Sequence, residues 1–400
     1  MGSDQLMESL HIDSVHGPSL SVVIDGSALA AITEDVHCHE QFIKLCMLAH
    51  TVVCCRVTPN QKCQVVTTIK DKGFVTLSVG DGGNDVLMIQ QANVGVGIRG
   101  REGLQAARAA DYNITKFSHL QRLILVHGRY SLHRTSMVAL YCFYKSIYVC
   151  MIQILYQVVC GFSGTSLLNT FSLTTYNTLF TELPILFYIL DKDVEESAIF
   201  EYPPTYQSNL GRSTSSLLNN FSPWIGKAVF QAVITLLTCL FTFWDWESAD
   251  GLGSSGRETM SAVVFTIVML VVQFTLALET NYFTHLNHLA VWGTVGFYFA
   301  ISYVISMVPA LGMYHVIHKV YGEWVFWFVI TIATIVCLIP LYIQKYAQTQ
   351  YFPKINELLR EQSLYSTNQT GDLWFPLSKL YCFFRPNRTQ NTSRIYQPLP

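Results

Sequence analysis

Three polar side chains in the segment SVGDGGNDVLMIQ (residues 78–90), Asp81, Asn84 and Asp85, are of the types that bind metal ions and phosphate groups. The segment follows the apolar run FVTLSV (residues 74–79), which is typical of a strand that delivers Asp81 to the carboxyl edge of a sheet. The two glycines after Asp81 allow a tight turn, and we expect Asn84 to cap a helix whose free N–H groups bind anions. Two carboxylates beside such donors suit Mg²⁺, which favours one or two carboxylates together with phosphate oxygens. The pattern predicts a phosphoryl site.

A second segment upstream, CRVTPNQK (residues 55–62), supplies a positive charge. Pro59 suits the first turn of a helix, and Lys62 lies about one turn further on, where its ammonium can neutralise phosphate charge at the same sheet edge. The TPxxK pattern followed by GDGxND is far more specific than either motif alone. A turn of Asp, Asn and Gly residues that only caps a helix is the alternative interpretation.

The glycine-rich segment GVGIRG (residues 95–100) matches the G-x-G-x-x-G pattern of dinucleotide-binding folds. It comes late in the predicted sheet rather than at the first strand–helix turn, and no acidic residue ends a further strand downstream. We therefore do not expect a dinucleotide site here.

Short apolar runs alternate with helical segments in the first 120 residues, which predicts an α/β domain with a parallel sheet covered on both faces. The predicted strands are SVVID (21–25), VVCCRV (52–57), FVTLSV (74–79) and NVGVGI (93–98). Because no clear element precedes residue 21, the pattern leaves open that the first strand of the sheet is missing.

The remaining chain is far more apolar. Half of the 400 residues are hydrophobic and only 13% are charged, which indicates a large membrane part. Six apolar runs are each long enough to cross a hydrocarbon core of about 30 Å as an α-helix. We place these runs at residues 137–160, 167–190, 225–244, 259–279, 288–308 and 323–344. A net charge of −2 argues against nucleic acid as a partner.

Positive charge predicts the orientation of these spans. Arginines precede the first run and Lys345 follows the last, whereas the loops predicted to lie outside hold only Arg257 and Lys319. We therefore expect both termini in the cytosol. The N-terminus has neither the basic nor the apolar region of a signal peptide. Eleven cysteines without a C-x-x-C pair indicate a reduced compartment.

Lys145 is the only formally charged residue in the first apolar run. A lysine at the centre of a membrane helix costs about 2.5–3.5 kcal/mol, so it either reaches the interface with its long side chain or faces the bundle interior. The second run contains TYNTLFTELP (residues 175–184), in which Pro184 frees a backbone carbonyl while Asn177 and Glu182 add oxygen atoms at a similar depth. An ion pair between Glu182 and Lys145 is one expectation.

Five segments, in this order and together with the six apolar runs, resemble the C-terminal part of a type IV P-type ATPase, a phospholipid flippase. They are CCRVTPNQK, VGDGGNDVLMIQQANVGVGI, EGLQAARAADY, ALYCFYK and TYNTLFTELP. The resemblance extends from about residue 20 to residue 345. It implies a partial phosphorylation domain of the haloacid-dehalogenase-like fold in residues 1–120, the last six of ten membrane spans in residues 121–345, and a polar cytosolic tail in residues 346–400.

The resemblance also implies roles for the polar residues near the sheet edge. Asp81 matches the aspartate that binds Mg²⁺, and Asp85 matches a second carboxylate that supports metal and phosphate. Asn84 and Lys62 match groups that contact the phosphoryl group or the phosphates of ATP, and Arg56 matches the arginine that opens the same segment. In such a site Mg²⁺ and Lys62 stabilise the charge of the transferring phosphoryl group.

In the membrane part, Lys145 matches the lysine that flippases carry in this helix, where the resemblance implies coupling to a lipid head group. Asn177 matches a transport residue, and Glu182 departs from the uncharged residue expected there. The family implies ATP-driven movement of a phospholipid, with aminophospholipid as the expected substrate, from the outer to the cytosolic leaflet. A small two-span accessory subunit and a plasma, Golgi or endosomal membrane are also implied.

One departure from the family concerns the phosphorylated aspartate. The D-K-T-G motif that holds it is absent from these 400 residues, so we expect a fragment or an inactive form. A P-type cation pump would share the phosphoryl site, but the charge of Lys145 repels cations and favours a lipid. A membrane remnant that binds Mg²⁺ or an accessory subunit without turnover is a further alternative.

Overall fold

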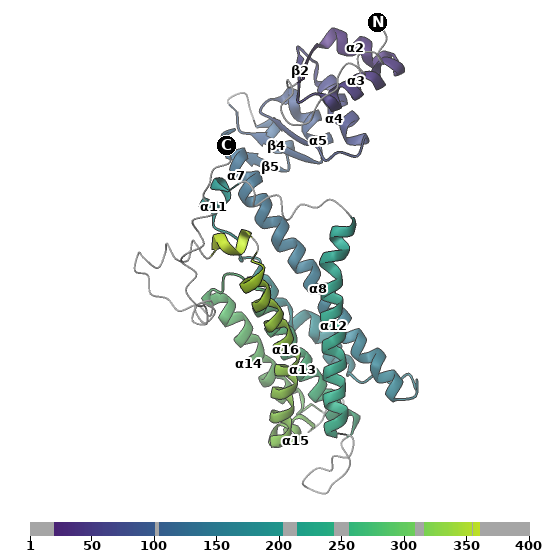
Figure 1. Ribbon diagram of the computed structural model, residues 1–400, viewed down its shortest axis with the longest axis vertical. Helices are drawn as coiled ribbons and strands as arrows, with labels where there is room; N and C mark the ends of the chain where they lie inside the picture. Colours follow the sequence, from purple (N-terminus) through teal and green to yellow (C-terminus); the bar gives the residue numbers. More distant parts are fainter. Residues whose placement is uncertain are drawn as a thin grey trace, which may run out of the picture. The chain divides into compact units, whose positions relative to one another are not determined.

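The computed structural model of the protein describes residues 20–100, 104–202, 214–243, 256–308, 316–353 and 355–360. The chain divides into two compact units, Met1–Ile124 and Leu125–Pro400. The first unit, purple to blue in Figure 1, contains strands and short helices, and the second consists of helices. The predicted combination of an α/β part and a helical membrane part is confirmed at this level.

Strands and helices alternate along the first unit. In chain order these elements are β1 (Ser21–Asp25), α2 (Gly26–Glu34), α3 (Val36–Leu48), β2 (Thr51–Cys55), α4 (Pro59–Asp71), β3 (Leu77–Gly80), η1 (Gly83–Asp85), α5 (Val86–Gln91), β4 (Val94–Ile98), α6 (Gln105–Ala109), β5 (Tyr112–Ile114) and α7 (His119–Arg122). All strand pairs are parallel, as predicted, but they form two sheets. β1 pairs with β2, while β3, β4 and β5 form a second sheet, and no ladder joins β2 to β3 within the described part of the chain.

Local capping explains where two helices of this unit begin. Asp25 ends β1, and its Oδ1 accepts a hydrogen bond from the Gly26 N–H at 2.7 Å as α2 starts. Thr58 starts α4 through a reciprocal capping box with Gln61, and Pro59 occupies the first turn as the sequence predicts. These caps fix the first residues of α2 and α4.

The prediction that Asn84 caps a helix is wrong. Asn84 lies inside the 3₁₀ turn η1, for which Gly82 is the N-cap, and α5 begins only at Val86. The chain leaves β3 through this turn, so the Asn84 side chain makes no capping hydrogen bond at the start of the α-helix. The start of α5 therefore lacks the Asn84 cap that the sequence suggests.

The glycines of GVGIRG serve helix packing. A Cβ atom at Gly97, in β4, would lie 2.6 Å from the Cα of Ala107 in α6. Only a residue without a side chain lets α6 pack this closely on the strand. The close approach of α6 to β4 therefore gives Gly97 a packing role.

The second unit is built from helices. They are α8 (Arg129–Val159), α9 (Thr170–Thr175), α10 (Glu182–Tyr188), α11 (Glu196–Glu201), α12 (Thr214–Phe243), α13 (Arg257–Glu279), α14 (His285–Ile305), α15 (Val316–Gly322) and α16 (Trp324–Tyr351), with π-helical segments η2 (Leu123–Gly128) before α8 and η3 (Tyr176–Phe180) after α9. Five of them, α8, α12, α13, α14 and α16, are long and apolar enough to cross a membrane.

Helix α13 is the most enclosed of these five. In its apolar stretch 83% of the residues are buried inside the protein, against 22–33% in the other four. It packs against α12, α14 and α16, while α8 packs along α12 (Figure 1). The core of the second unit is therefore centred on α13.

The apolar run predicted at residues 167–190 does not form one long helix. It folds as α9, the π-helical segment η3 and the short α10. Pro184 explains the break, because it has no N–H to donate to the carbonyl of Phe180 four residues earlier and its ring crowds that carbonyl. Five long helices and one broken segment thus stand where the sequence predicts six spans.

The loop after α10 is bound to two other parts of the second unit. Two N–H groups of Arg129, at the start of α8, donate to Asp193 Oδ2 at 2.9 and 2.7 Å, and both side chains are buried. Asp191 accepts from the backbone N–H groups of Asn281 and Tyr282, which follow α13. These bonds hold the loop beside the end of α13 and the beginning of α8.

Candidate functional site

An open hollow of about 540 Å³ lies in the first unit, where β3 ends. Its walls are largely apolar side chains of β2, α4 and α5 and of the segments next to them. Lys62, Asp81 and Asp85 are the charged side chains that line it. The structure thus brings together three of the residues that the sequence singles out.

Lys62 and Asp85 form an ion pair in this hollow. The Nζ of Lys62 lies 2.8 Å from Oδ1 of Asp85, and the two side chains are 33% and 13% exposed. Lys62 is positioned by the first turn of α4, which the Thr58–Gln61 capping box fixes. The pair therefore joins α4 to the turn that follows β3.

Gly80, the last residue of β3, makes room for Asp85. A Cβ atom at this position would collide with the Cβ and the carboxyl group of Asp85. The Asp85 side chain lies directly against the strand backbone as a result. The first glycine of the GDG turn is therefore required by the carboxylate of Asp85, five residues later.

Asp81 and Asn84 are both exposed, and Asp81 contributes to the lining of the hollow. Arg56 has a φ of 51°, a left-handed conformation that is uncommon outside glycine, and its side chain is exposed. Neither Arg56 nor Asn84 is among the described residues that line the hollow. The structure therefore gathers Lys62, Asp81 and Asp85, and leaves the other two outside.

The donor set of the hollow fits Mg²⁺. Asp81 offers an exposed carboxylate, and Asp85 keeps one carboxylate oxygen beyond the one that contacts Lys62. Magnesium binds through one or two carboxylates and completes its shell with water and phosphate oxygens, which an open hollow admits. Asp81 and Asp85 are the residues that would hold the ion.

Gln61 is a lining residue that the sequence reasoning missed. Its Nε2 donates to the Gly26 carbonyl at 2.8 Å, which ties α4 to the first residue of α2. The T-x-x-Q spacing of the capping box would have pointed to it. Cys54 also lines the hollow. The pKa of its thiol is raised, mainly by desolvation and to a smaller extent by the nearby thiol of Cys55, so Cys54 is protonated at neutral pH.

A second candidate site surrounds Lys145 in the helical unit. Lys145 is only 5% exposed, and its Nζ donates a hydrogen bond to Thr181 Oγ1 at 2.8 Å. Thr181 Oγ1 in turn donates to the Tyr176 carbonyl at 2.9 Å. Lys145 therefore faces the interior and contacts the broken segment, and it does not extend toward an interface.

Two other polar residues of the second run, Asn177 and Glu182, do not share the buried environment of Lys145. Asn177 and Glu182 are both exposed. Among the described residues no carboxylate lies within ion-pair distance of Lys145, so the expected pair with Glu182 does not form. Thr181, the residue before Glu182, is the partner that the structure provides, and the sequence reasoning gave it no role of its own.

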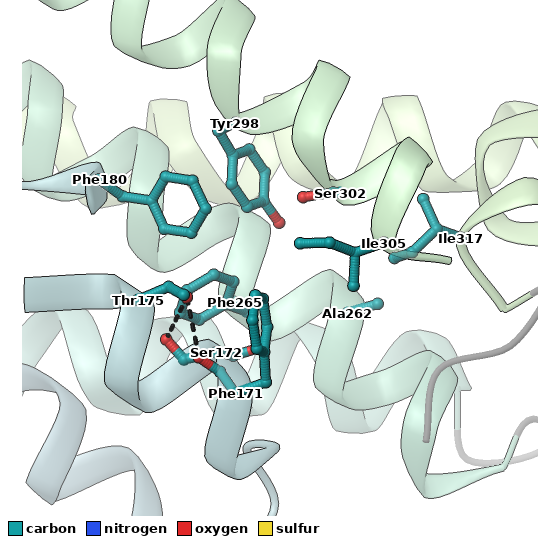
Figure 2. Close-up of a pocket in the computed structure, with 10 residues that line it drawn as sticks. All are labelled: Phe171, Ser172, Thr175, Phe180, Ala262, Phe265, Tyr298, Ser302, Ile305 and Ile317. Carbon is teal, nitrogen blue, oxygen red and sulfur yellow. Dashed lines mark hydrogen bonds between the residues drawn. The ribbon is translucent and has the colours of Figure 1, made fainter. Parts of the chain in front are cut away.

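A small cavity lies beside the broken segment, between α9, η3, α13, α14 and α15 (Figure 2). Its volume of about 20 Å³ admits little more than one water-sized molecule. Aromatic rings of Phe180, Phe265 and Tyr298 surround it, and Thr175 Oγ1 bonds within its own helix to the carbonyls of Phe171 and Ser172. The cavity is too small for a lipid head group.

Comparison with known proteins assigns most of this chain to one description. The family model "Phospholipid-translocating P-type ATPase C-terminal" matches residues 107–354. The matched region contains every helix from α8 to α16 and ends shortly after α16.

Curated relatives cover nearly the whole chain. "Phospholipid-transporting ATPase 2" of Arabidopsis thaliana is 38% identical over 365 residues, which is 90% of this chain and 32% of that protein. "Phospholipid-transporting ATPase IH" of Homo sapiens is 34% identical over 89% of this chain and 33% of its own length. "Phospholipid-transporting ATPase ID" of Homo sapiens is 33% identical over 87% and 29%. The chain spans about a third of the length of these relatives.

Proposed function

The chain belongs to the phospholipid-translocating P-type ATPases, and from this membership we propose that it forms the membrane part and part of the phosphorylation site of an ATP-driven phospholipid flippase. It is an integral membrane protein, and the part of the chain that the structure describes contains five apolar helices long enough to cross a membrane. Its relatives are named phospholipid-transporting ATPases. ATP hydrolysis and lipid movement by the longer protein are the substance of the proposal.

The environment of Lys145 favours a lipid over a cation as the transported substrate. Its ammonium is buried and bound to a hydroxyl, and no carboxylate in the described residues pairs with it. A cation-binding site at this depth needs several oxygen ligands, and a neighbouring positive charge weakens such a site. An anionic phosphate in a lipid head group would instead be attracted by this ammonium.

The hollow in the first unit supports the phosphoryl-transfer part of the proposal. Lys62 would neutralise charge on the ATP phosphates and hold Asp85, while Asp81 and Asp85 would bind Mg²⁺. The chemistry that a bound Mg²⁺ supplies is neutralisation of the charge on the phosphoryl oxygens. Arg56 and Asn84 would contribute only after their exposed side chains turn toward bound nucleotide.

We propose that the two sheets are parts of one haloacid-dehalogenase-like sheet. β2 and β3 do not pair with each other, yet residues at the ends of both line the same hollow. One additional parallel strand between them would join the sheets and could bring an aspartate to the hollow. The phosphorylated aspartate of the proposed aspartyl-phosphate intermediate would come from such a strand, since this sequence has no D-K-T-G motif.

The broken segment is proposed as the sixth membrane crossing. At about 1.5 Å per residue, a helical path from Thr170 to Tyr188 covers roughly 28 Å, close to the thickness of a hydrocarbon core. Six crossings would place both termini in the cytosol. Movement of aminophospholipid toward the cytosolic leaflet of a plasma, Golgi or endosomal membrane, with a two-span accessory subunit, completes the proposal.

An inactive membrane form is the second candidate, because the D-K-T-G aspartate is absent from these residues. ATP hydrolysis by the purified full-length protein in liposomes separates the candidates. Stimulation by a phospholipid, with ATP-dependent translocation of a fluorescent analogue, is the expected result. Stimulation by metal cations alone would indicate a cation pump, and no ATP hydrolysis with either phospholipid or metal cations would favour the inactive form.

A further inference from the structure

A buried glutamine supports the broken segment from the neighbouring helix. Gln273, on α13, is 0% exposed. Its Nε2 donates a hydrogen bond to the backbone carbonyl of Phe180 at 2.5 Å. A side-chain amide at such a buried position costs free energy unless it is hydrogen-bonded. The question is why the Phe180 carbonyl is free to accept this bond.

Pro184 provides that explanation. In a regular α-helix the carbonyl of Phe180 would accept from the N–H of residue 184, but proline has none. The amide of Gln273 replaces the missing donor with one from another helix. The ring of Phe180 is held as well, because it packs edge-on against Tyr298 with ring centroids 5.2 Å apart (Figure 2).

The residue after Phe180 is the one that meets Lys145. Thr181 is 0% exposed, and its Oγ1 accepts from Lys145 Nζ at 2.8 Å. Gln273 thus fixes one residue of the break and Lys145 contacts the next. A shift of the Phe180 carbonyl would move Thr181 with it, because the two share a peptide bond.

We propose that Gln273 is a positioning residue. It donates the hydrogen bond that the Phe180 carbonyl lacks because of Pro184, and it thereby holds Thr181 against the Lys145 ammonium. The importance of this contact for lipid movement rests on the function proposed above. The other amide atom, Oε1, is buried and has no hydrogen-bond partner in the described part of the protein. The bond to Phe180 is therefore what orients this side chain.

The test is a rescue experiment on the purified full-length protein. Gln273→Met keeps the length of the side chain and removes the donor. We expect a melting temperature several degrees lower and a severalfold higher apparent KM for phospholipid in ATP hydrolysis, with a smaller change in kcat. Pro184→Ala restores an N–H that can pair with Phe180 within the helix. The double variant should therefore have a melting temperature and an apparent KM for phospholipid close to those of Pro184→Ala alone.

Gln231→Met is the matched control. Gln231 is also 0% exposed, but its amide accepts from the Tyr144 hydroxyl and does not contact the break. Pro184→Ala should not rescue this variant. If Gln273→Met yields no folded protein, recovery of folded protein from the double variant is the supporting result, and its absence overturns the proposal.

The proposal would also be overturned if Pro184→Ala rescued Gln273→Met and Gln231→Met equally, or rescued neither. The melting temperatures do not require any transport activity. Specific thermal rescue in a protein that phospholipid does not stimulate would therefore leave the Gln273 assignment standing and refute the flippase function. Lipid stimulation of the wild-type protein without thermal rescue of Gln273→Met would support the flippase function and refute the Gln273 assignment.

Discussion

Lys62 and Lys145 are both placed by a single short contact, but their surroundings differ. Lys62 is one-third exposed and has a carboxylate partner, whereas Lys145 is buried and bonded to a hydroxyl. The positive charge of Lys62 is balanced inside its own unit. Lys145 forms no ion pair with any described residue, so the two lysines should respond differently to substitution.

Asp81→Asn should lower Mg²⁺-dependent ATP hydrolysis of the full-length protein by roughly 100-fold or more, because it removes the exposed carboxylate of the hollow. The measurement is phosphate release at saturating ATP and Mg²⁺. Asp71→Asn, at the end of α4, is the matched control and should hydrolyse ATP normally. Normal turnover by Asp81→Asn would remove this residue from the site.

Lys145→Ala should raise the phospholipid concentration needed for half-maximal ATP hydrolysis by roughly 10–100-fold, the value of a charged hydrogen bond. Phosphorylation of the protein by ATP should survive, because the first unit is untouched. Lys319→Ala, on α15, serves as the control for loss of a lysine. Unchanged lipid stimulation in Lys145→Ala would reduce the lysine to a packing residue.

Gly80→Ala tests the fit between β3 and Asp85. The added methyl group would push the Asp85 carboxyl away from its place beside Lys62, at a cost of about 1–3 kcal/mol in the free energy of unfolding. We expect a lower melting temperature and weaker ATP binding. Gly296→Ala, where an added Cβ meets no atom within 4 Å, should change neither.

Among the elements, the broken segment shows where sequence reasoning reaches its limit. The proline and the freed carbonyl could be predicted, and so could a buried role for Lys145. The π-helical segment η3 could not, and it changes which side chains face inward: Asn177 is exposed and Thr181 is buried. A regular helical period does not hold across such a segment, so the polar partner was misidentified.

The first turn of α4 offers a test at the same scale. Thr58→Ala removes the capping box and should destabilise the helix by about 1 kcal/mol, which loosens Lys62 and raises the KM for ATP. Thr58→Ser should restore both properties. Thr67→Ala, whose hydroxyl bonds only within α4, is the comparison on the same helix. An effect of equal size in both alanine variants would argue against the cap.

Across the whole molecule, composition predicted the division into an α/β part and a membrane part, and five of the six apolar runs are long helices. The parallel pairing of strands also followed from their alternation with helices. The separation of β2 from β3 did not, because the pairing of a central strand depends on long-range contacts that no local pattern records.

The crossing of the membrane by the broken segment is the prediction at this scale. Single cysteines placed at Ser163 and Lys192, in a variant without the natural cysteines, should be labelled from opposite sides of sealed vesicles. A cysteine at Tyr282 should report the same side as Lys192, because Asp191 is bonded to the backbone of both Asn281 and Tyr282. Labelling of Ser163 and Lys192 from one side would show that the segment re-enters.

The enclosure of α13 bears on how the protein is made. This helix is apolar enough to enter a bilayer alone, yet in the folded protein 83% of the residues in its apolar stretch are buried inside the protein. The same apolar surface therefore has two roles. It favours insertion of α13 into the bilayer during synthesis, and it forms the packed core once α14 and α16, which are synthesised later, cover it. Mutations that make α13 more polar should first reduce membrane integration, before they affect the assembled protein.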